Sequence, residues 1–201
     1  MRGHGQTDSP ADQAQYSEDA SVDDMAAILK ALGVSQAVIG GLSLGGYMSL
    51  AFYLKYPQMT RALMLFDTGP GYRNPQAREG WNQTSYQRAQ RFEEGGLAAL
   101  SGGEEVRTST HRSAAGLAMA ARGMLAQFDS RVIGSLENIK VPTLVLVGAN
   151  DQAFLAATDY MAARIPGATK VVIADAGHAA NLHQPAAFNQ AVEAFLRGAE
   201  V

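Results

Sequence analysis

The chain has 201 residues, a net charge of −3 at pH 7 and no cysteine, a length that fits one domain with a substantial core. Its apolar content of 47% and charged content of 17% are those of an ordinary globular protein and not of a disordered one. The lack of cysteine excludes disulfides, thiolate metal sites and a cysteine nucleophile, and no basic stretch predicts binding to nucleic acid or to an anionic membrane.

Strand and helix patterns alternate along most of the chain. Residues 1–16 are polar and predict a loop, and a helix is expected over 18–32, with Ser17 as its cap and Gly33 at its end. Strands are expected at 36–41, 60–67, 141–148 and 169–175, and further helices at 45–56, 154–165 and 185–198. This alternation predicts a mostly parallel sheet with flanking helices, an α/β fold.

Residues 69–135 differ in character from the rest. They are rich in Gln, Arg, Ser and Gly and show helical patterns near 76–94 and 113–127, without a strand pattern. We expect a helical cap inserted into a core formed by 1–68 and 136–201. Trp81, Met119 and Met124 are the apolar residues of the insertion that we expect to line a substrate pocket, although each fits the interior of the cap equally well.

The stretch Gly41-Leu42-Ser43-Leu44-Gly45 matches G-x-S-x-G between a strand and a helix. In that context the motif places a serine on a strained turn that exposes its hydroxyl, with glycine needed at both flanking positions to avoid collisions. The amide of Leu44, at the start of the helix, can donate to an oxyanion. The motif by itself is weak, since a glycine-rich turn can hold an incidental serine, but its position favours a nucleophile.

A serine nucleophile needs a base, and the base needs a carboxylate that orients it. His178 follows the strand 169–175, at the end of a strand where an open α/β sheet carries its chemistry, and is favoured over His183 five residues later. Asp151 follows the strand 141–148 in the same way. Asp67, at the end of 60–67, is the rival acid, unless it is a turn former. The predicted catalytic residues are Ser43, Asp151 and His178.

These motifs resemble the α/β-hydrolase superfamily, in its group of small serine esterases, lactonases and cofactor-free haloperoxidases. GLSLGGYMSLAFYLKYP is similar to the nucleophile turn and its helix, VPTLVLVGANDQAF to the acid loop, and VVIADAGHAANLHQPAAFNQAVEAFL to the histidine loop and last helix. RGHGQTDSP resembles the loop after the family's fourth strand. The resemblance therefore implies that the N-terminal strands of the sheet are missing, together with one oxyanion donor, and that 36–41 is an exposed edge able to pair with a second copy.

The first interpretation is a serine hydrolase of carboxylic esters, lactones or thioesters that needs no cofactor or metal. Its partner would be a small ester-type substrate, with no role for nucleic acid or membrane, and a homodimer could form through the exposed edge. The alternatives are a truncated or non-catalytic ligand-binding protein on this scaffold, and perhydrolysis by the same three residues. The N-terminus lacks the apolar core of a signal peptide and no apolar run reaches about 18 residues, so a cytoplasmic location is expected.

Overall fold

The computed structural model describes residues 1–103, 106 and 109–199. Its contacts divide the chain into two compact units: a helical unit of residues 1–25 and 71–130, and a sheet unit of residues 26–70 and 131–201. The division differs from the domains expected above mainly because the first 25 residues cluster with the helical segment and not with the sheet. The helical segment itself is 71–130, against the 69–135 that the sequence predicts.

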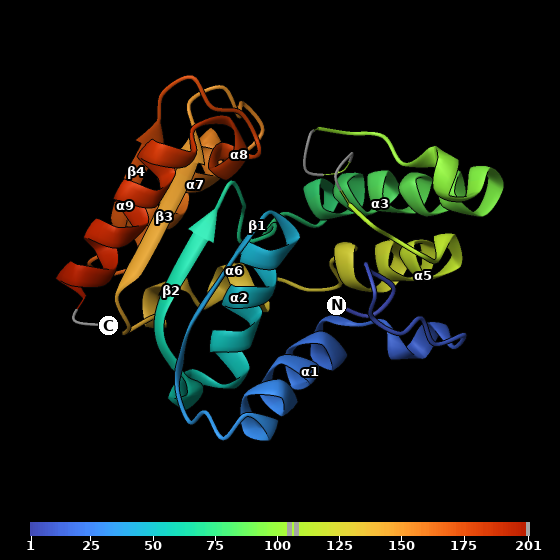
Figure 1. The fold of residues 1–201 in the computed structure, drawn as a ribbon, viewed down its shortest axis with the longest axis horizontal. Coiled ribbons are helices and arrows are strands. Elements are labelled where there is room, and N and C mark those ends of the chain that lie inside the picture. Colours follow the sequence, from blue (N-terminus) through green and yellow to red (C-terminus); the bar gives the residue numbers. More distant parts are fainter. Residues whose placement is uncertain (104–105, 107–108, 200–201) are drawn as a thin grey trace. The chain divides into compact units, whose positions relative to one another are not determined.

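The sheet unit is built on four parallel strands in the order β1-β2-β3-β4 (Figure 1). They are β1 (Ala37–Leu42), β2 (Thr60–Phe66), β3 (Thr143–Gly148) and β4 (Thr169–Ile173). All four strands were predicted, with ends that differ by at most two residues. Every residue of β3 is buried, as expected for a parallel strand covered on both faces.

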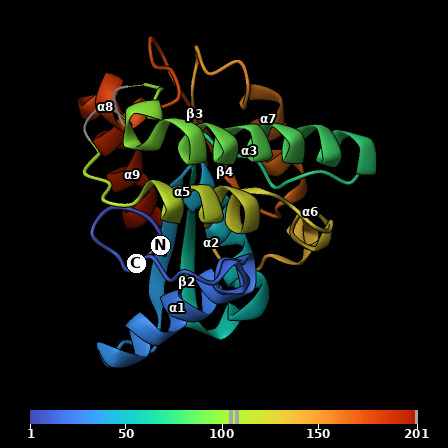
Figure 2. The same cartoon turned by 90° about the vertical axis from the view of Figure 1, so that its right-hand side faces the viewer.

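Helices cover the two faces of this sheet. Alternate residues of the strands, such as Ala62, Leu144 and Leu146, form one cluster with the apolar side of α9 (Pro185–Gly198). Figures 1 and 2 show α2 (Leu44–Lys55) and α7 (Leu155–Arg164) on the opposite side, where α2 contacts β1 and β2 and α7 contacts β3 and β4. Because the strands are parallel, their carboxyl ends meet at one edge of the sheet.

β1 lies at one end of the described sheet and pairs there with β2. The expectation that this strand forms an edge is confirmed. Unpaired backbone groups on such an edge can accept another strand, and pairing of two copies along β1 stays a prediction.

Several short elements of the sheet unit were not predicted. They are η2 (Pro57–Met59), α6 (Arg131–Gly134), η5 (Leu136–Asn138) and α8 (Ala180–His183). Segments of three or four residues are too short for a hydrophobic period to show in the sequence.

The helical unit pairs α3 (Pro75–Gly95) with α5 (Ala114–Ala120). They meet in a cluster of small and apolar side chains that also includes the first residue after α5: Ala89, Phe92, Leu117, Ala118 and Ala121. The helix expected over 113–127 is interrupted, because α5 passes into a π-helical turn, η4 (Ala121–Leu125). Among its described residues the helical unit also has the short turns η1 (Gln13–Gln15) and η3 (Gly96–Ala99).

Helix α1 (Glu18–Ala31) begins as the sequence predicts. The Ser17 hydroxyl accepts a hydrogen bond from the amide of Ala20 at 3.0 Å, the bond of an N-cap. The boundary between the two units falls inside this helix, after Met25.

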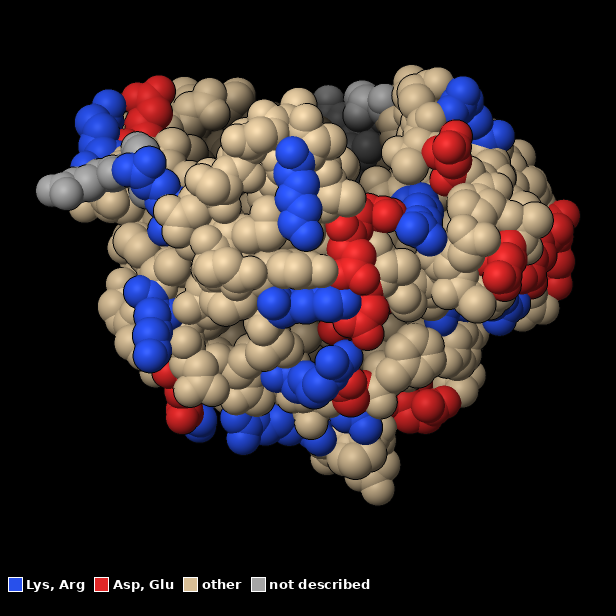
Figure 3. Space-filling view, turned by 90° about the horizontal axis from the view of Figure 1, so that it is seen from below, with Lys and Arg blue, Asp and Glu red and all other residues tan. Residues whose placement is uncertain are grey.

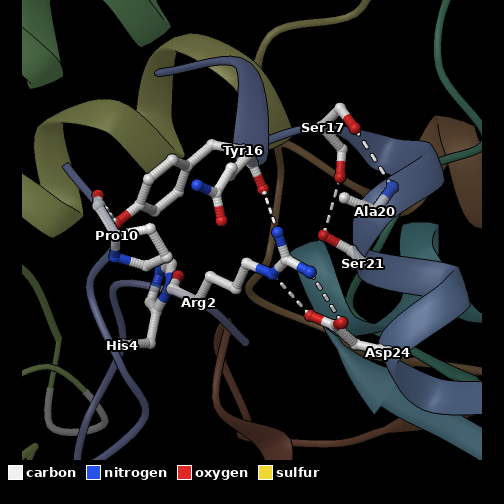
Figure 4. Close-up of polar contacts among 9 residues, drawn as sticks. Arg2, His4, Pro10, Tyr16, Ser17, Ala20, Ser21 and Asp24 are labelled. Atoms are coloured by element: carbon white, nitrogen blue, oxygen red, sulfur yellow. Dashed lines mark hydrogen bonds and ion pairs between the residues drawn. The ribbon is translucent and has the colours of Figure 1, made fainter. Parts of the chain in front are cut away.

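The N-terminal segment is fixed to its own unit by polar contacts (Figure 4). The Arg2 guanidinium donates two hydrogen bonds to the Asp24 carboxylate, at 2.8 and 2.9 Å, and a third to the carbonyl of Gln15 at 2.9 Å. The Tyr16 hydroxyl donates to the carbonyl of Pro10 at 2.9 Å. A bidentate arginine–carboxylate pair of this kind fixes orientation as well as charge.

Close backbone approaches explain why residues 1–25 join the helical unit. A Cβ on Gly116 would lie 2.9 Å from the Cα of Gly3, and a Cβ on Gly123 would meet the carbonyl oxygen of Tyr16. Only residues without a side chain allow these contacts. They are tertiary contacts between distant segments, which a strand or helix pattern does not reveal.

Within the described part of the chain, the helices lack the combination of length and apolar character that a membrane-spanning segment needs. On the face shown in Figure 3, the Lys and Arg side chains lie interspersed with Asp and Glu.

Candidate active site

Ser43 lies between the end of β1 and the first residue of α2, with φ 55° and ψ −117°. A non-glycine residue rarely adopts a positive φ, and such strain concentrates at functional sites. The Ser43 hydroxyl makes no capping bond to α2 and its side chain is half-buried. The amide of Leu44 opens α2 and has no partner within the helix, so it is suited to donate to an anionic oxygen.

Close packing requires glycine at two positions around Ser43, and the motif predicts only one of them. A Cβ on Gly41 would lie 2.6 Å from the carbonyl carbon of Gly45, which no backbone accommodates. A Cβ on Gly45 would meet nothing within 4 Å, so the predicted need for glycine there is wrong. The second required glycine is Gly46, whose Cβ would lie 2.5 Å from the Cγ2 of Thr68.

His178 and Asp151 are brought together at the carboxyl ends of β4 and β3. The Nδ1 of His178 lies 2.9 Å from the Oδ2 of Asp151. Asp151 is buried and the imidazole is half-exposed. With Nδ1 donating to the carboxylate, Nε2 is left as the basic nitrogen. The two residues that the sequence analysis selected as base and acid are therefore hydrogen-bonded.

Phe154 and His183 take part in holding His178, and sequence reasoning missed both roles. The ring of Phe154 stacks on the imidazole of His178, with centroids 5.2 Å apart. The Nδ1 of His183 accepts a hydrogen bond from the amide of Gly177 at 2.8 Å. His183 therefore holds the backbone beside His178. For Phe154, the available sequence signal was an aromatic residue just after the acid loop.

Asp67, the rival acid, lies at the end of β2 in a different role. Its carboxyl group is fully buried, its φ is 45°, and its Oδ1 accepts a hydrogen bond from the amide of Gly148 at 2.8 Å. The other oxygen, Oδ2, is buried and makes no hydrogen bond of ordinary geometry among the described residues, although the backbone of Ala180 lies close enough to lower the pKa of this carboxyl. Burial raises the pKa of Asp67 to about 6; the Gly148 bond opposes this rise and the nearby Asp151 adds to it.

The raised pKa of Asp67 predicts that Asp67→Asn stabilises the protein in a pH-dependent way. Between the ordinary pKa near 3.8 and about 6, the native carboxyl keeps a proton that the unfolded chain has lost, so wild-type stability falls as pH rises through this window. Asn removes the charge, tolerates a positive φ and still accepts from Gly148. The free energy of unfolding of Asp67→Asn, relative to that of wild type, should therefore grow by up to about 3 kcal/mol from pH 4 to pH 7. Urea unfolding at several pH values measures this difference. An advantage independent of pH would contradict the assignment.

The remaining predicted residues lie in the helical unit. The indole N–H of Trp81 donates to the carbonyl of Leu125 at 2.8 Å, Met124 is buried and Met119 is half-buried. Their role in a pocket stays a prediction.

His4 and His111 pack edge to face with ring centroids 5.6 Å apart, and burial lowers the pKa of His4. Among the described residues no group of three or more metal-ligating side chains occurs.

Comparisons with known proteins agree with this fold. The family model described as the alpha/beta hydrolase fold matches residues 1–115. A putative 2-succinyl-6-hydroxy-2,4-cyclohexadiene-1-carboxylate synthase of Bacillus subtilis is 27% identical, over 96% of this chain and 78% of its own. A 3-oxoadipate enol-lactonase of Acinetobacter baylyi is 29% identical, over 98% of this chain and 76% of its own. The solved structure of an esterase of Thermogutta terrifontis superposes with a TM-score of 0.81 and 31% identity, over 100% of this chain and 79% of the esterase chain. The chain belongs to the alpha/beta hydrolase fold family and is a hydrolase.

Proposed function

We propose that the chain hydrolyses a carboxylic ester, lactone or thioester through Ser43, His178 and Asp151. The observation that carries the proposal is the His178–Asp151 hydrogen bond at the same edge of the sheet as the strained Ser43 turn. Each residue follows a different strand, and all three strands run parallel. This is the set of residue types that nucleophilic acyl transfer requires.

In this mechanism the Oγ of Ser43 attacks the substrate carbonyl while Nε2 of His178 accepts the serine proton. Asp151 holds the imidazole through Nδ1 and stabilises the imidazolium that forms. The negative oxygen of the tetrahedral intermediate accepts a hydrogen bond from the amide of Leu44, next to the positive end of α2. His178 then protonates the leaving group. A water molecule, activated by the same histidine, releases the acyl group from Ser43.

The relatives support the class of substrate. One is named an enol-lactonase and another an esterase, and in both names the bond cleaved is an acyl–oxygen bond. A serine at the nucleophile position fits such substrates, because attack at an acyl carbon gives an acyl-enzyme that water can resolve.

A fluorophosphonate probe tests the proposal directly. We expect one covalent adduct in the intact mass of the wild-type protein, located at Ser43 by peptide mapping and absent from Ser43→Ala. The same preparation should hydrolyse members of a panel of short-chain aryl esters, γ- and δ-lactones and acyl thioesters. An adduct accompanied by oxidation of a halide in the presence of peroxide, with no hydrolysis, would favour perhydrolysis. A folded protein that forms no adduct would overturn the proposal in favour of a non-catalytic role.

A further inference from the structure

Two adjacent residues at the end of β2 connect the loops that carry the proposed catalytic residues. The hydroxyl of Thr68 donates a hydrogen bond to the carbonyl oxygen of Ser43 at 2.6 Å. The carboxyl of Asp67 accepts from the amide of Gly148 at 2.8 Å, three residues before Asp151. Both side chains are buried, with exposed fractions of 2% and 0%.

The Thr68 bond is an addition to the ordinary helix bonds of the nucleophile turn. The carbonyl of Ser43 already accepts from the amides of Gly46 and Tyr47, at 3.0 and 3.1 Å. A satisfied carbonyl does not need a third donor for stability. The methyl group of Thr68 also fills the space beside Gly46, where an added Cβ would lie 2.5 Å away. The side chain therefore fixes the position of Ser43 through both a bond and a packing contact.

The Asp67 bond acts on the other two catalytic loops. Gly148 ends β3, and a Cβ there would meet the carbonyl oxygens of Gly177 and Ala176, so the acid and histidine loops pack closely at this point. The amide of Asn150 also donates to the carbonyl of Ala176 at 2.8 Å. A shift of Gly148 would thus move both members of the Asp151–His178 pair.

We propose that Asp67 and Thr68 are positioning residues that together hold the Ser43 turn in register with the Asp151–His178 pair. The inference rests on the proposed function, and it adds to it a brace that acts through backbone groups and not on substrate. Productive attack depends on placing the nucleophile and its base to within fractions of an ångström. Because Asp67 and Thr68 are adjacent at the end of β2, they link the Ser43 turn to the Asp151–His178 pair through a single rigid segment.

The first test compares Thr68→Val with Thr68→Ser. Valine keeps the shape beside Gly46 and removes the hydroxyl, whereas serine keeps the hydroxyl. We expect valine to slow fluorophosphonate labelling and kcat for an aryl ester by about tenfold, with KM little changed. Serine should restore the rate to within about threefold of wild type. Equal rates for valine and wild type would overturn the role of Thr68.

The second test compares Asp67→Gly with Asp67→Asn. Glycine suits the positive φ and deletes the acceptor for Gly148, while asparagine keeps an acceptor oxygen. We expect about a tenfold loss of kcat for glycine and rescue by asparagine. Because the two residues form one brace, the loss in Asp67→Gly/Thr68→Val should be smaller than the product of the single losses. Fully multiplicative losses would mean two independent contacts and would overturn the shared brace.

A measurement without substrate separates failure of this inference from failure of the proposed function. Amide hydrogen exchange of peptides covering 40–48 and 147–152 reports the mobility of the two loops in any folded variant. We expect faster exchange at 40–48 in Thr68→Val than in Thr68→Ser. If wild type forms no adduct but residues 40–48 still exchange faster in Thr68→Val than in Thr68→Ser, the proposed function is wrong. Asp67 and Thr68 then hold the two loops in place without a role in catalysis. If wild type is active and exchange is the same in both variants, the brace is overturned.

Discussion

Replacement of Ser43 with glycine should abolish turnover and leave the protein at least as stable as wild type. Without the hydroxyl no acyl-enzyme forms, and the loss of a serine nucleophile costs about 10⁶-fold in kcat in a hydrolase of this kind. At φ 55° and ψ −117° a glycine is relaxed where serine is strained, which offsets the entropy that glycine gains in the unfolded chain. Ester hydrolysis and thermal unfolding, measured on the same preparation, check both parts.

Ser43→Ala is the matched control for this prediction. Alanine also lacks the hydroxyl but keeps the Cβ, so it should lose activity to the same extent and gain no stability from relief of strain. Loss of activity in both variants, with a higher unfolding temperature for glycine than for alanine, would fit a strained nucleophile. Residual turnover above about 1% of wild type in either folded variant would exclude Ser43 as the nucleophile.

Asp151→Asn should lower kcat by about 10⁴-fold with little change in fold. An asparagine can fill the same space beside His178, but its amide no longer presents a negative charge and can favour the wrong imidazole tautomer. The effect should appear in kcat and not in KM, since Asp151 acts through the base and not on the substrate. Steady-state hydrolysis of an aryl ester at several pH values measures it.

Two other aspartates serve as comparisons for Asp151. Asp159 is 64% exposed and pairs with Lys170 on the surface, so Asp159→Asn should leave kcat unchanged. Asp67→Asn separates the two acids that the sequence left open, and we expect its kcat to remain within about threefold of wild type. A loss near 10⁴-fold in Asp67→Asn, with an active Asp151→Asn, would transfer the role of the acid to Asp67.

The sequence predicted the strands and the large helices well because each has a strong local signal. Buried parallel strands such as 143–148 are continuous apolar runs, and helix starts and stops are marked by residues such as Ser17 and Pro57. The G-x-S-x-G pattern predicted the turn between strand and helix that holds Ser43, and the ends of later strands pointed to Asp151 and His178, which the structure shows hydrogen-bonded to each other. Chain order along a parallel sheet is enough to bring such residues to one edge.

What only the tertiary structure decided are the contacts between segments far apart in the chain. It showed that Gly46 and not Gly45 needs to be glycine, because the obstacle is Thr68, 22 positions later. It also gave Asp67 and Thr68 their partners, Gly148 and Ser43, and it joined residues 1–25 to the helical unit. A hydrophobic period or a motif reports the environment of neighbouring residues along the chain, whereas these contacts depend on which distant backbone atoms the packed fold brings within hydrogen-bonding or van der Waals range.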